Sequence, residues 1–337
     1  MRITDPVLVP DTSVYVDHII PQEFIDGGCE SIVIGIYSTV VNSKKVLHPT
    51  TRAQFEVATK SSLLIQAYIW DDIILDPIVQ ADWVVQTIKS EGLPVKWLWA
   101  DQEMYWTNWV AWDNWRHDPI KYPASTVPVA KPINISSHNQ VFMERVNSQF
   151  PNSGVYTNNG FVASWASGMN TWLPKYKSWV PEYLKQPKEA TKMTWAQLKA
   201  NWLPDFDITL ATGQLPEKVA GLQFTGDTCI LPGSYNYANV EMSLDVSVFS
   251  KTFIDGLRSG VNIPIPAPKP PIPAPIPTGV AYRVLYPRIN VRNAPSGSAQ
   301  WVRYAVLNEI VYVSNISNGW AQLTDNTWIF ASYLQKV

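Results

Sequence analysis

Residues 95–103 read Val-Lys-Trp-Leu-Trp-Ala-Asp-Gln-Glu, a run that predicts a buried strand ending in two carboxylates, Asp101 and Glu103. Side chains two positions apart on a strand project to the same side of the sheet. The spacing therefore predicts that both acids share one face. Five aromatic residues follow closely, namely Tyr105, Trp106, Trp109, Trp112 and Trp115. Paired carboxylates beside aromatic rings are typical of sites that hydrolyse sugar polymers.

Strand-like and helix-like segments alternate on both sides of this stretch. The strand candidates are residues 14–20, 31–37, 63–70, 95–103, 153–158, 178–183, 219–224 and 242–246, and the helix candidates include 50–60, 77–91 and 138–150. This alternation predicts parallel strands joined by helical crossovers, hence an α/β fold. About eight strands over roughly 250 residues match a (β/α)₈-type barrel.

A proline-rich segment predicts a boundary between two domains. Residues 263–277 contain eight prolines, which cannot supply the backbone donors of a helix or sheet. An extended linker is expected, although such a segment could also dock to a proline-binding partner. We expect a catalytic domain at residues 1–260, a linker at 261–278 and a small all-β barrel at 279–337, where short β-type runs alternate with polar turns.

Composition excludes several classes of function. The chain has 337 residues, a net charge of −2 and no Lys/Arg cluster, so nucleic acid is not an expected partner. No run reaches the roughly 18 apolar residues that span a bilayer, and the N-terminus lacks the apolar core of a signal peptide. We therefore expect no membrane insertion and synthesis in the cytoplasm. Two cysteines far apart predict neither a disulfide framework nor a metal site, and no cofactor is expected.

Seven short motifs occur in order along the first 255 or so residues. They are Asp17 near the end of the first expected strand, Tyr68-Ile-Trp70, Asp101-Gln-Glu103, residues 155–158 (Val-Tyr-Thr-Asn), residues 179–183 (Trp-Val-Pro-Glu-Tyr), Leu222-Gln-Phe224 and residues 244–249 (Leu-Asp-Val-Ser-Val-Phe). Together they resemble the motifs of glycoside hydrolase family 25 lysozymes (muramidases), which occur in many phage endolysins. The chain departs from that pattern where Asp17-His-Ile replaces the usual D-V-S. Residues 107–135 resemble an insertion.

The resemblance implies cleavage of the β-1,4 bond between N-acetylmuramic acid and N-acetylglucosamine. Glu103 is then the general acid, its pKa raised by desolvation and by the charge of Asp101. Asp101 is expected to stay ionised and either to support charge on the sugar or to orient its N-acetyl group. Asp17 and Asp245 would complete an acidic ring at the carboxyl ends of the first and last strands. The alternatives are a salt-bridged strand-end acid for Glu103 and a cap or turn acid for Asp17 and Asp245.

Aromatic and amide side chains are the candidates for sugar binding. They are Tyr68, Trp70, Trp106, Tyr156, Tyr183 and Gln223, with Tyr68 and Tyr156 favoured. Core packing is the alternative for each aromatic residue. Trp109, Trp112 and Trp115 have helical spacing, so a packing stripe is at least as good an interpretation as a glycan platform.

Three motifs near the C-terminus resemble a bacterial SH3-like (SH3b) domain. They are residues 289–295 (Ile-Asn-Val-Arg-Asn-Ala-Pro), Asn318-Gly-Trp320 and residues 328–334 (Trp-Ile-Phe-Ala-Ser-Tyr-Leu). The resemblance implies binding of a stem peptide or cross-bridge of bacterial peptidoglycan, while the glycan strand lies in the barrel groove. The expected protein is a phage endolysin released to the cell wall by a holin. The alternatives are a non-catalytic cell-wall or glycan-binding protein, such as a phage structural component, and a glycosidase for another polysaccharide.

Overall fold

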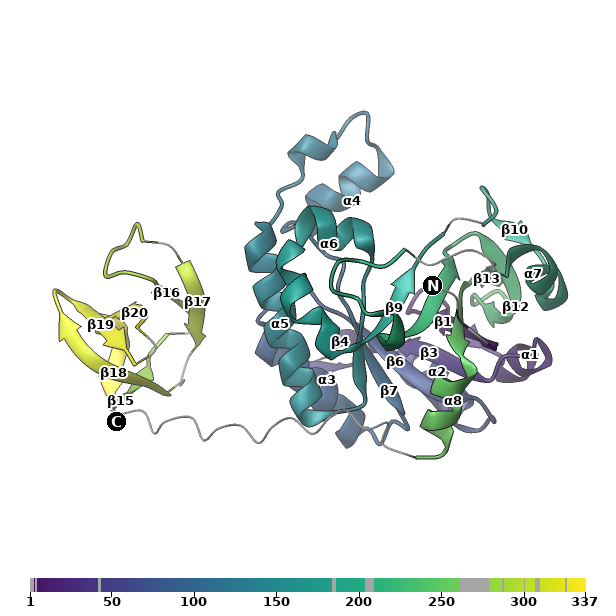
Figure 1. Ribbon diagram of the computed structural model, residues 1–337, viewed down its shortest axis with the longest axis horizontal. Helices are drawn as coiled ribbons and strands as arrows, with labels where there is room; N and C mark the ends of the chain where they lie inside the picture. The colour runs from purple at the N-terminus through teal and green to yellow at the C-terminus, as the bar shows by residue number, and fades with distance from the viewer. Residues whose placement is uncertain are drawn as a thin grey trace. The chain divides into compact units, whose positions relative to one another are not determined.

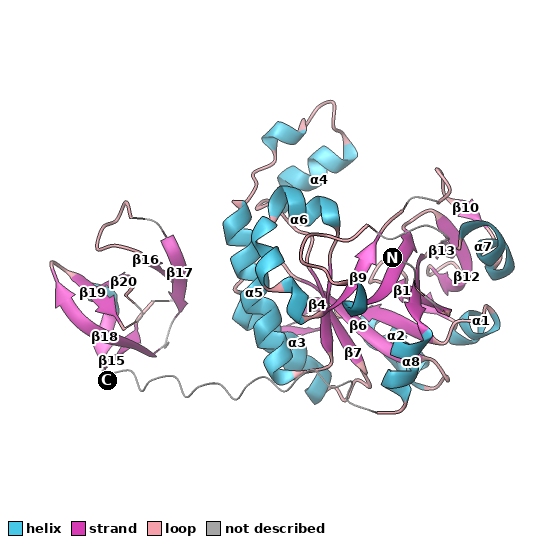
Figure 2. Cartoon of the chain, viewed as in Figure 1, coloured by secondary structure: helices cyan, strands magenta, loops and turns pink. Residues whose placement is uncertain are grey.

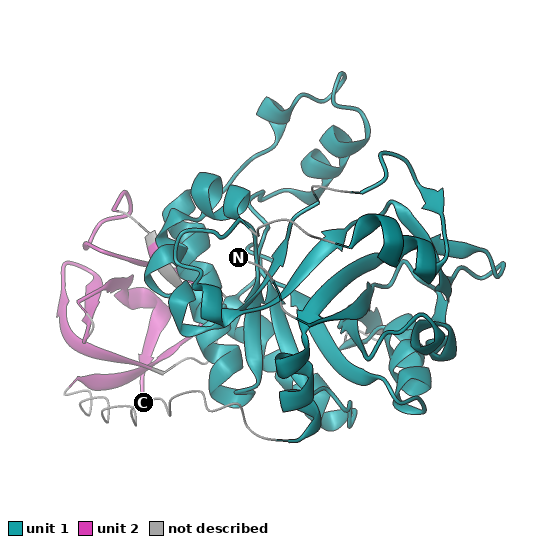
Figure 3. Cartoon of the chain, turned by 45° about the vertical axis from the view of Figure 1, so that its right-hand side comes forward, with its two compact units in different colours: residues 1–264 teal, residues 265–337 magenta. Residues whose placement is uncertain are grey.

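The structure is a computed structural model that describes residue 3 and residues 5–41, 44–183, 186–203, 209–260, 279–286, 288–299, 301–306, 310–324 and 326–337 (Figure 1). Helices and strands are mixed in the first part of the chain, whereas strands dominate the last part (Figure 2). The chain divides into two compact units, residues 1–264 and 265–337 (Figure 3). The expected linker at 261–278 lies outside the described residues.

A closed eight-stranded barrel forms the centre of the first unit. Its strands, in order around the barrel, are β1 (Pro6–Thr12), β3 (Ser31–Gly35), β6 (Leu64–Trp70), β7 (Trp97–Asp101), β8 (Ser153–Tyr156), β9 (Lys177–Pro181), β11 (Val219–Thr225) and β14 (Asp245–Ser250), which pairs again with β1. The α/β barrel predicted from the alternation of segments is confirmed.

One barrel strand runs against the others. Strands β1, β3, β6, β7, β8, β9 and β11 are parallel, but β14 is antiparallel to both β11 and β1. Between β11 and β14 the chain forms two short strands, β12 (Cys229–Tyr235) and β13 (Glu241–Ser243), in place of a crossover helix. A parallel return needs a long crossover, whereas an antiparallel return does not. The first residue of β14, Asp245, therefore lies at the barrel end where the other strands finish.

Helices follow most of the barrel strands (Figure 1). They are α1 (Pro21–Asp26), α2 (Pro49–Thr59), α3 (Pro77–Ser90), α4 (Trp109–His117), α5 (Pro132–Gln149), α6 (Asn159–Trp165), α7 (Trp195–Trp202) and α8 (Lys251–Arg258), with the 3₁₀ turns η1 (Ala124–Thr126), η2 (Ser167–Thr171), η3 (Leu173–Lys175) and η4 (Pro216–Lys218). The predicted helices at 50–60, 77–91 and 138–150 correspond to α2, α3 and α5. Helix α3 begins where Asp76 accepts hydrogen bonds from the N–H groups of Ile78 and Val79, with Pro77 in the first turn.

The first and last predicted strands are misplaced. The first barrel strand is β1 (Pro6–Thr12) and not residues 14–20, where the structure has only the two-residue β2 (His18–Ile19), paired with β12 outside the barrel. Residues 7–12 are all buried, whereas Tyr15 is 78% exposed. The prolines at positions 6 and 10 obscured this strand. The predicted run 242–246 spans the end of β13 and the start of β14.

Aromatic side chains fill the barrel interior. The buried strand that the sequence predicts within residues 95–103 is β7. Trp97 and Trp99 of β7 point into this core and are at most 1% exposed. The indole N–H of Trp99 donates to Gln66 Oε1 at 2.9 Å, which satisfies a buried donor. Phe253 of α8 packs on Trp97 with ring centroids 5.1 Å apart. The barrel is thus a packed support for groups at the ends of its strands.

The remaining described strands of the first unit are short. They are β4 (Ser38–Val41), β5 (Lys44–Leu47) and β10 (Thr191–Lys192). Both cysteines, Cys29 and Cys229, are buried free thiols. No helix within the described residues has the length and apolar character needed to cross a membrane.

The second unit is an antiparallel β structure around its own apolar core. Its elements are β15 (Val280–Val284), β16 (Arg288–Arg292), β17 (Trp301–Val306), β18 (Ile310–Ser317), β19 (Trp320–Leu323), β20 (Trp328–Phe330), η5 (Ala331–Tyr333) and β21 (Leu334–Lys336), and the sheet order is β17-β16-β20-β19-β18-β15-β21. The all-β character expected of this region is confirmed. Its resemblance to SH3b domains stays a prediction.

Candidate active site

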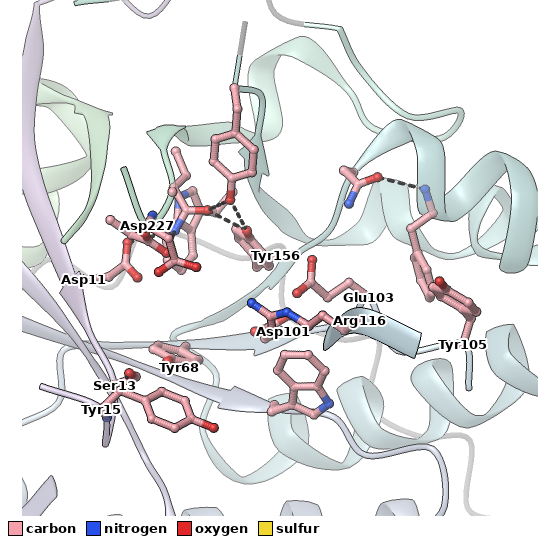
Figure 4. A pocket seen from close by; sticks show the side chains of 18 of the residues that line it. Asp11, Ser13, Tyr15, Tyr68, Asp101, Glu103, Tyr105, Arg116, Tyr156 and Asp227 are labelled. Carbon is pink, nitrogen blue, oxygen red and sulfur yellow. Dashed lines mark hydrogen bonds between the residues drawn. The ribbon is translucent and has the colours of Figure 1, made fainter. Parts of the chain in front are cut away.

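A cavity of about 710 Å³ lies at the barrel end where the parallel strands finish. Five carboxyl groups line it, those of Asp11, Asp101, Glu103, Asp227 and Asp245. Figure 4 labels the first four of them. Asp11 is near the end of β1, Asp101 ends β7, and Asp245 begins the reversed strand β14. Asp11 and Asp245 are direct neighbours in the pairing of β1 with β14. The barrel topology thus brings together acids that are far apart in the sequence.

The structure does not bring Asp17 into this cavity. A carboxylate oxygen of Asp17 accepts a hydrogen bond from the backbone N–H of Tyr237 at 2.8 Å, and neither of these residues lines the cavity. Asp11 occupies the position that the sequence analysis assigned to Asp17. The signal was present in the sequence, because the apolar run 7–9 leads to Asp11-Thr-Ser13, which is closer to D-V-S than Asp17-His-Ile.

Asp101 and Glu103 both line the cavity, as predicted, although the strand ends at Asp101 and Glu103 lies beyond it. Asp101 is only 7% exposed, and its Oδ1 atom receives no hydrogen bond from any described residue. Burial, then the charge of Glu103, raises the pKa of Asp101 well above 3.8. Desolvation raises the pKa of Glu103 to about 7. The expectation that Asp101 stays ionised is therefore not supported.

Gln223 of β11 links the acids of β1 and β14 to two tyrosines. Its amide nitrogen donates to Asp11 Oδ2 at 2.9 Å and, over 3.4 Å, to Asp245 Oδ2. Its amide oxygen accepts from the hydroxyl of Tyr156 at 2.6 Å and from that of Tyr183. Both donors and the acceptor of this amide are thus used. Gln223 fixes the position of groups on four strands or loops.

The two acids joined by Gln223 also have raised pKa values. Burial raises the pKa of Asp11 to about 7, against the lowering effect of its hydrogen bond to Gln223. The pKa of Asp245 is raised well above 3.8 by burial and then by the charge of Asp11. Neighbouring carboxyl groups in one cavity cannot all ionise without strong repulsion. The cluster therefore retains protons near neutral pH.

Asp227 is an acid of the cavity that the sequence analysis missed. It has a positive φ of 52°, a conformation that Asp tolerates better than most residues. Its backbone N–H donates to Asp245 Oδ1 at 2.7 Å. The residue follows an irregularity in the pairing of β11 with β14, between Gln223 and Thr225. An irregularity in strand pairing leaves no periodic pattern in the sequence, so Asp227 could not be predicted from it.

The six predicted sugar-binding residues, Tyr68, Trp70, Trp106, Tyr156, Tyr183 and Gln223, all line the cavity. Their exposure differs, however. Tyr68 and Tyr156 are at most 9% exposed, whereas Tyr183 is 41% exposed. The hydroxyl of Tyr68 lies 2.9 Å from that of Tyr37, which also lines the cavity. Of the three tyrosines, Tyr183 offers the most surface to a ligand, and the two favoured by the sequence analysis are largely part of the core.

A buried polar network lies directly behind the acid pair. His138 of α5 lies 2.9 Å from Asp71 Oδ1, and the side chains of His138 and Asp71 are 11% and 0% exposed. Burial lowers the pKa of His138, but the charge and hydrogen bond of Asp71, together with the charges of Asp72 and Asp76, raise it above its ordinary value. Gln102, between the two acids in sequence, donates from its amide nitrogen to Asp71 Oδ2 at 3.0 Å. The backbone N–H of Asp71 donates to the carbonyl of Asp101 at 2.9 Å.

We expect Asp71→Asn to lower the free energy of unfolding by about 3 kcal/mol, because a buried charge loses its partner. Urea denaturation of the full chain measures this. The matched control is Asp82→Asn, whose partner Arg145 is 44% exposed. That exposed pair should contribute less than about 1 kcal/mol. Equal effects of the two substitutions would show that the buried network stabilises the fold no more than an exposed ion pair does, contrary to this prediction.

The raised pKa values also predict how stability depends on pH. Asp11 and Glu103 have folded-state pKa values of about 7, against ordinary values of 3.8 and 4.5. The folded protein therefore holds these protons more tightly than the unfolded chain, so the contribution of these two groups to stability is fully present below about pH 4 and is lost as pH rises to about 7. Melting temperatures of wild type and Asp11→Asn across this range test it. The melting temperature of Asp11→Asn should fall less than that of the wild type as pH rises. Identical pH dependence of the two melting temperatures would contradict a raised pKa for Asp11.

The structure shows no group of three or more His, Cys, Asp or Glu side chains arranged to hold a metal ion among its described residues. The carboxyl groups of the cavity are distributed around its wall, on separate strands and loops. The carboxyl, hydroxyl and amide groups that line the cavity can transfer protons, stabilise charge and form hydrogen bonds.

The chain was compared with known proteins by sequence and by fold. No protein-family model matches it, and a search of curated proteins gives no significant match. Solved structures do match. A bacterial lysozyme from Streptomyces coelicolor has a TM-score of 0.50 at 14% identity, with 76% of this chain and 99% of that chain covered. A family 25 glycosyl hydrolase from Bacillus anthracis has a TM-score of 0.48 at 14% identity, with 76% of this chain and 95% of that chain covered.

A muramidase from Trichobolus zukalii has a TM-score of 0.47 at 14% identity, with 75% of this chain and 99% of that chain covered. The Streptomyces coelicolor lysozyme supports the conclusion that the barrel unit has a lysozyme fold of the kind expected from the sequence motifs. At this identity the likeness is one of fold alone. The activity has to be argued from the cavity itself.

Proposed function

We propose that the protein is a peptidoglycan hydrolase that cleaves the β-1,4 bond between N-acetylmuramic acid and N-acetylglucosamine. The observation that carries this proposal is the convergence of Asp11, Asp101, Glu103 and Asp245 in one aromatic-walled cavity at the barrel end. Glycoside hydrolysis requires a proton donor and a group that stabilises an oxocarbenium-like centre. A cluster of carboxyl groups that cannot all ionise together supplies both.

Glu103 is the proposed proton donor. A pKa of about 7, caused by desolvation, leaves much of this carboxyl protonated at neutral pH. The side chain is half-buried at the wall of the cavity, within reach of solvent and ligand. Its neighbours in sequence, Gln102 and Met104, are buried and fix the segment that carries it.

Asp101 is proposed to act on the sugar ring next to the cleaved bond. Binding of a glycan and transfer of the Glu103 proton both change the charge around Asp101, whose own pKa depends on Glu103. In the glycan complex the coupled pair is proposed to hold one proton, on Glu103, which passes to the leaving oxygen, while Asp101 is already ionised and faces the positive charge at the anomeric carbon. Asp101 then supports that charge or orients the N-acetyl group for substrate-assisted attack. Asp11 and Asp245, held by Gln223, complete the acidic wall.

The second unit is proposed to be an SH3b-like module that binds the peptide part of the wall. An aromatic groove of about 560 Å³ supports this, because Tyr286, Trp320, Phe330 and Tyr333 line it together with Arg292. Such a groove suits an extended peptide. A chain that joins a muramidase barrel to a wall-binding module fits a phage endolysin that is made in the cytoplasm and released by a holin.

Incubation of the full chain with purified bacterial cell walls tests the proposal. Hydrolysis predicts release of soluble glycan and a fall in turbidity. Sedimentation of the protein with the walls, without any new reducing ends, would instead identify a non-catalytic wall-binding protein. Release of soluble sugar from another polysaccharide in a substrate panel, without release from peptidoglycan, would show that the protein is a glycosidase for that polysaccharide.

A further inference from the structure

The segment between β7 and α5 forms a projection beside the cavity. Its two ends are held together, since Thr107 N–H donates to the carbonyl of Pro128 and Ala130 N–H donates to that of Tyr105, both at 2.9 Å. An isolated bridge also pairs Trp106 with Val129. The helix α4 lies within this projection. The base of the projection is thus fixed at Tyr105 and Trp106, which themselves line the cavity.

Helix α4 contributes to the cavity wall and not to the core of the barrel. None of its residues is buried. Trp112 stacks on Trp106 with ring centroids 4.1 Å apart and an interplanar angle of 9°, and both Trp112 and Trp115 line the cavity. Trp109, the third tryptophan of this spacing, packs on Trp106 and Trp112 and does not line the cavity. Packing is therefore the role seen for Trp109, whereas Trp112 both packs on Trp106 and lines the cavity.

Arg116 adds a positive charge to this wall. It lines the cavity, as Figure 4 shows, and its guanidinium carbon lies 5.4 Å from the ring centroid of Trp112. Every other charged residue lining this cavity is acidic. Within the described part of the chain, Arg116 makes no ion pair with a carboxylate, unlike its neighbour in the helix, His117, which lies 3.3 Å from Asp113 Oδ1. Its fixed charge is therefore available to a ligand.

We infer that Trp112, Trp115 and Arg116 form a subsite for a substituent of the glycan that carries a carboxylate. The guanidinium group presents a planar fork of donors that matches a carboxylate, and aromatic faces accept the apolar face of a sugar or a side chain. A ligand carboxylate would be repelled by the acid cluster, so Arg116 places it at the α4 wall. The inference rests on the proposed function and narrows it, since it predicts preference for acidic over neutral glycans.

Two sources can supply this carboxylate. One is a sugar acid, such as a free lactyl group on the glycan. The other is a peptide attached to the glycan, which carries carboxylates of its own. Both present the same chemistry to Arg116, and ligands of equal glycan length separate them.

Binding measured in the full chain with Glu103→Gln tests the inference without ligand turnover. Isothermal titration uses a neutral N-acetylglucosamine oligomer, an oligomer with free lactyl carboxylates and an oligomer whose lactyl groups are amide-linked to peptides. Adding Arg116→Gln should weaken binding of one or both acidic ligands about tenfold, the size expected for one charge-assisted hydrogen bond. Binding of the neutral oligomer should not change. Arg116→Lys should restore part of the loss.

Lys121→Gln is the matched control, because Lys121 is a cation of the same projection that lies over Tyr122 and does not line the cavity. It should leave all three affinities unchanged. Equal weakening of neutral and acidic ligands by Arg116→Gln would indicate a structural effect and overturn the inference. Unchanged affinities, or no binding of any oligomer, would also overturn it. Absence of hydrolysis by the wild-type chain, with this discrimination intact, would refute only the proposed activity.

Discussion

Glu103→Gln is expected to lower the rate of peptidoglycan hydrolysis by about 10²–10⁴-fold, the usual contribution of a general acid. Gln is close in size to Glu but has no proton to transfer to the leaving oxygen. The cavity favours the protonated, neutral form of Glu103, since desolvation raises its pKa to about 7. The Glu103→Gln variant, which has a neutral amide in this position, should therefore fold with the stability of the wild type. Turbidity reduction on purified walls measures the rate, and thermal unfolding checks the fold.

Glu144→Gln is the control for this substitution. Glu144 lies on α5 with 47% of its side chain exposed, 3.6 Å from Lys175. The control should retain wild-type activity. Both variants should still sediment with the walls, because the proposed wall-binding unit is unchanged. Wild-type hydrolysis by Glu103→Gln would exclude Glu103 as the proton donor.

Asp11→Asn is expected to reduce hydrolysis by about 10²-fold, the size of effect seen when a preorganised charge or donor is removed from an active site. Asp11 lines the cavity, receives a hydrogen bond from Gln223 at 2.9 Å and raises the pKa of Asp101 and Asp245. Its replacement changes the charge of the whole cluster. The rate of wall hydrolysis, compared with that of the wild type at several pH values, measures this.

Asp17→Asn is the paired variant, because the sequence motifs pointed to Asp17 and the structure points to Asp11. Asp17 accepts a surface hydrogen bond from the backbone N–H of Tyr237 and does not line the cavity. Its replacement should leave hydrolysis within about twofold of wild type, since surface changes away from a site have small effects. Loss of activity in Asp17→Asn with full activity in Asp11→Asn would contradict the site described here.

The strand that ends at the acid pair could be predicted because its signals are local. The alternation of Trp97 and Trp99 with smaller residues fixes which side chains enter the barrel, and the acids follow directly in sequence. The helix predicted at 77–91 was equally clear and corresponds to α3, since apolar residues recur with helical spacing after Pro77 and Gly92 follows its end. Local patterns of this kind do not depend on the rest of the fold.

The position of Asp11 and the direction of β14 depend on tertiary structure. Prolines at positions 6 and 10 interrupt the pattern of β1, yet both are accommodated in its pairing with β14. The reversal of β14 follows from the short connection through β12 and β13, and composition alone does not reveal which way a strand will run. The same reversal brings Asp245 to the cavity from the start of its strand and not from the end.

The tryptophans of α4 show what helical spacing can predict and what it cannot. Their spacing correctly predicted a helix, but sequence could not decide between packing and ligand binding. The structure shows that the partner of Trp112 is Trp106, which belongs to the base of the projection and not to the barrel core. Asp227 had no detectable signal, because its place in the cavity results from a local irregularity of β11 and a left-handed backbone.

The central claim is that the four acids Asp11, Asp101, Glu103 and Asp245 form a muramidase site. Identification of the new reducing ends in a digest of purified peptidoglycan tests it most directly. After borohydride reduction, the wild-type digest should contain reduced N-acetylmuramic acid at the new ends, and the Glu103→Gln digest should contain almost none. Reduced N-acetylglucosamine at those ends, or no new reducing ends from the wild-type chain, would contradict the claim.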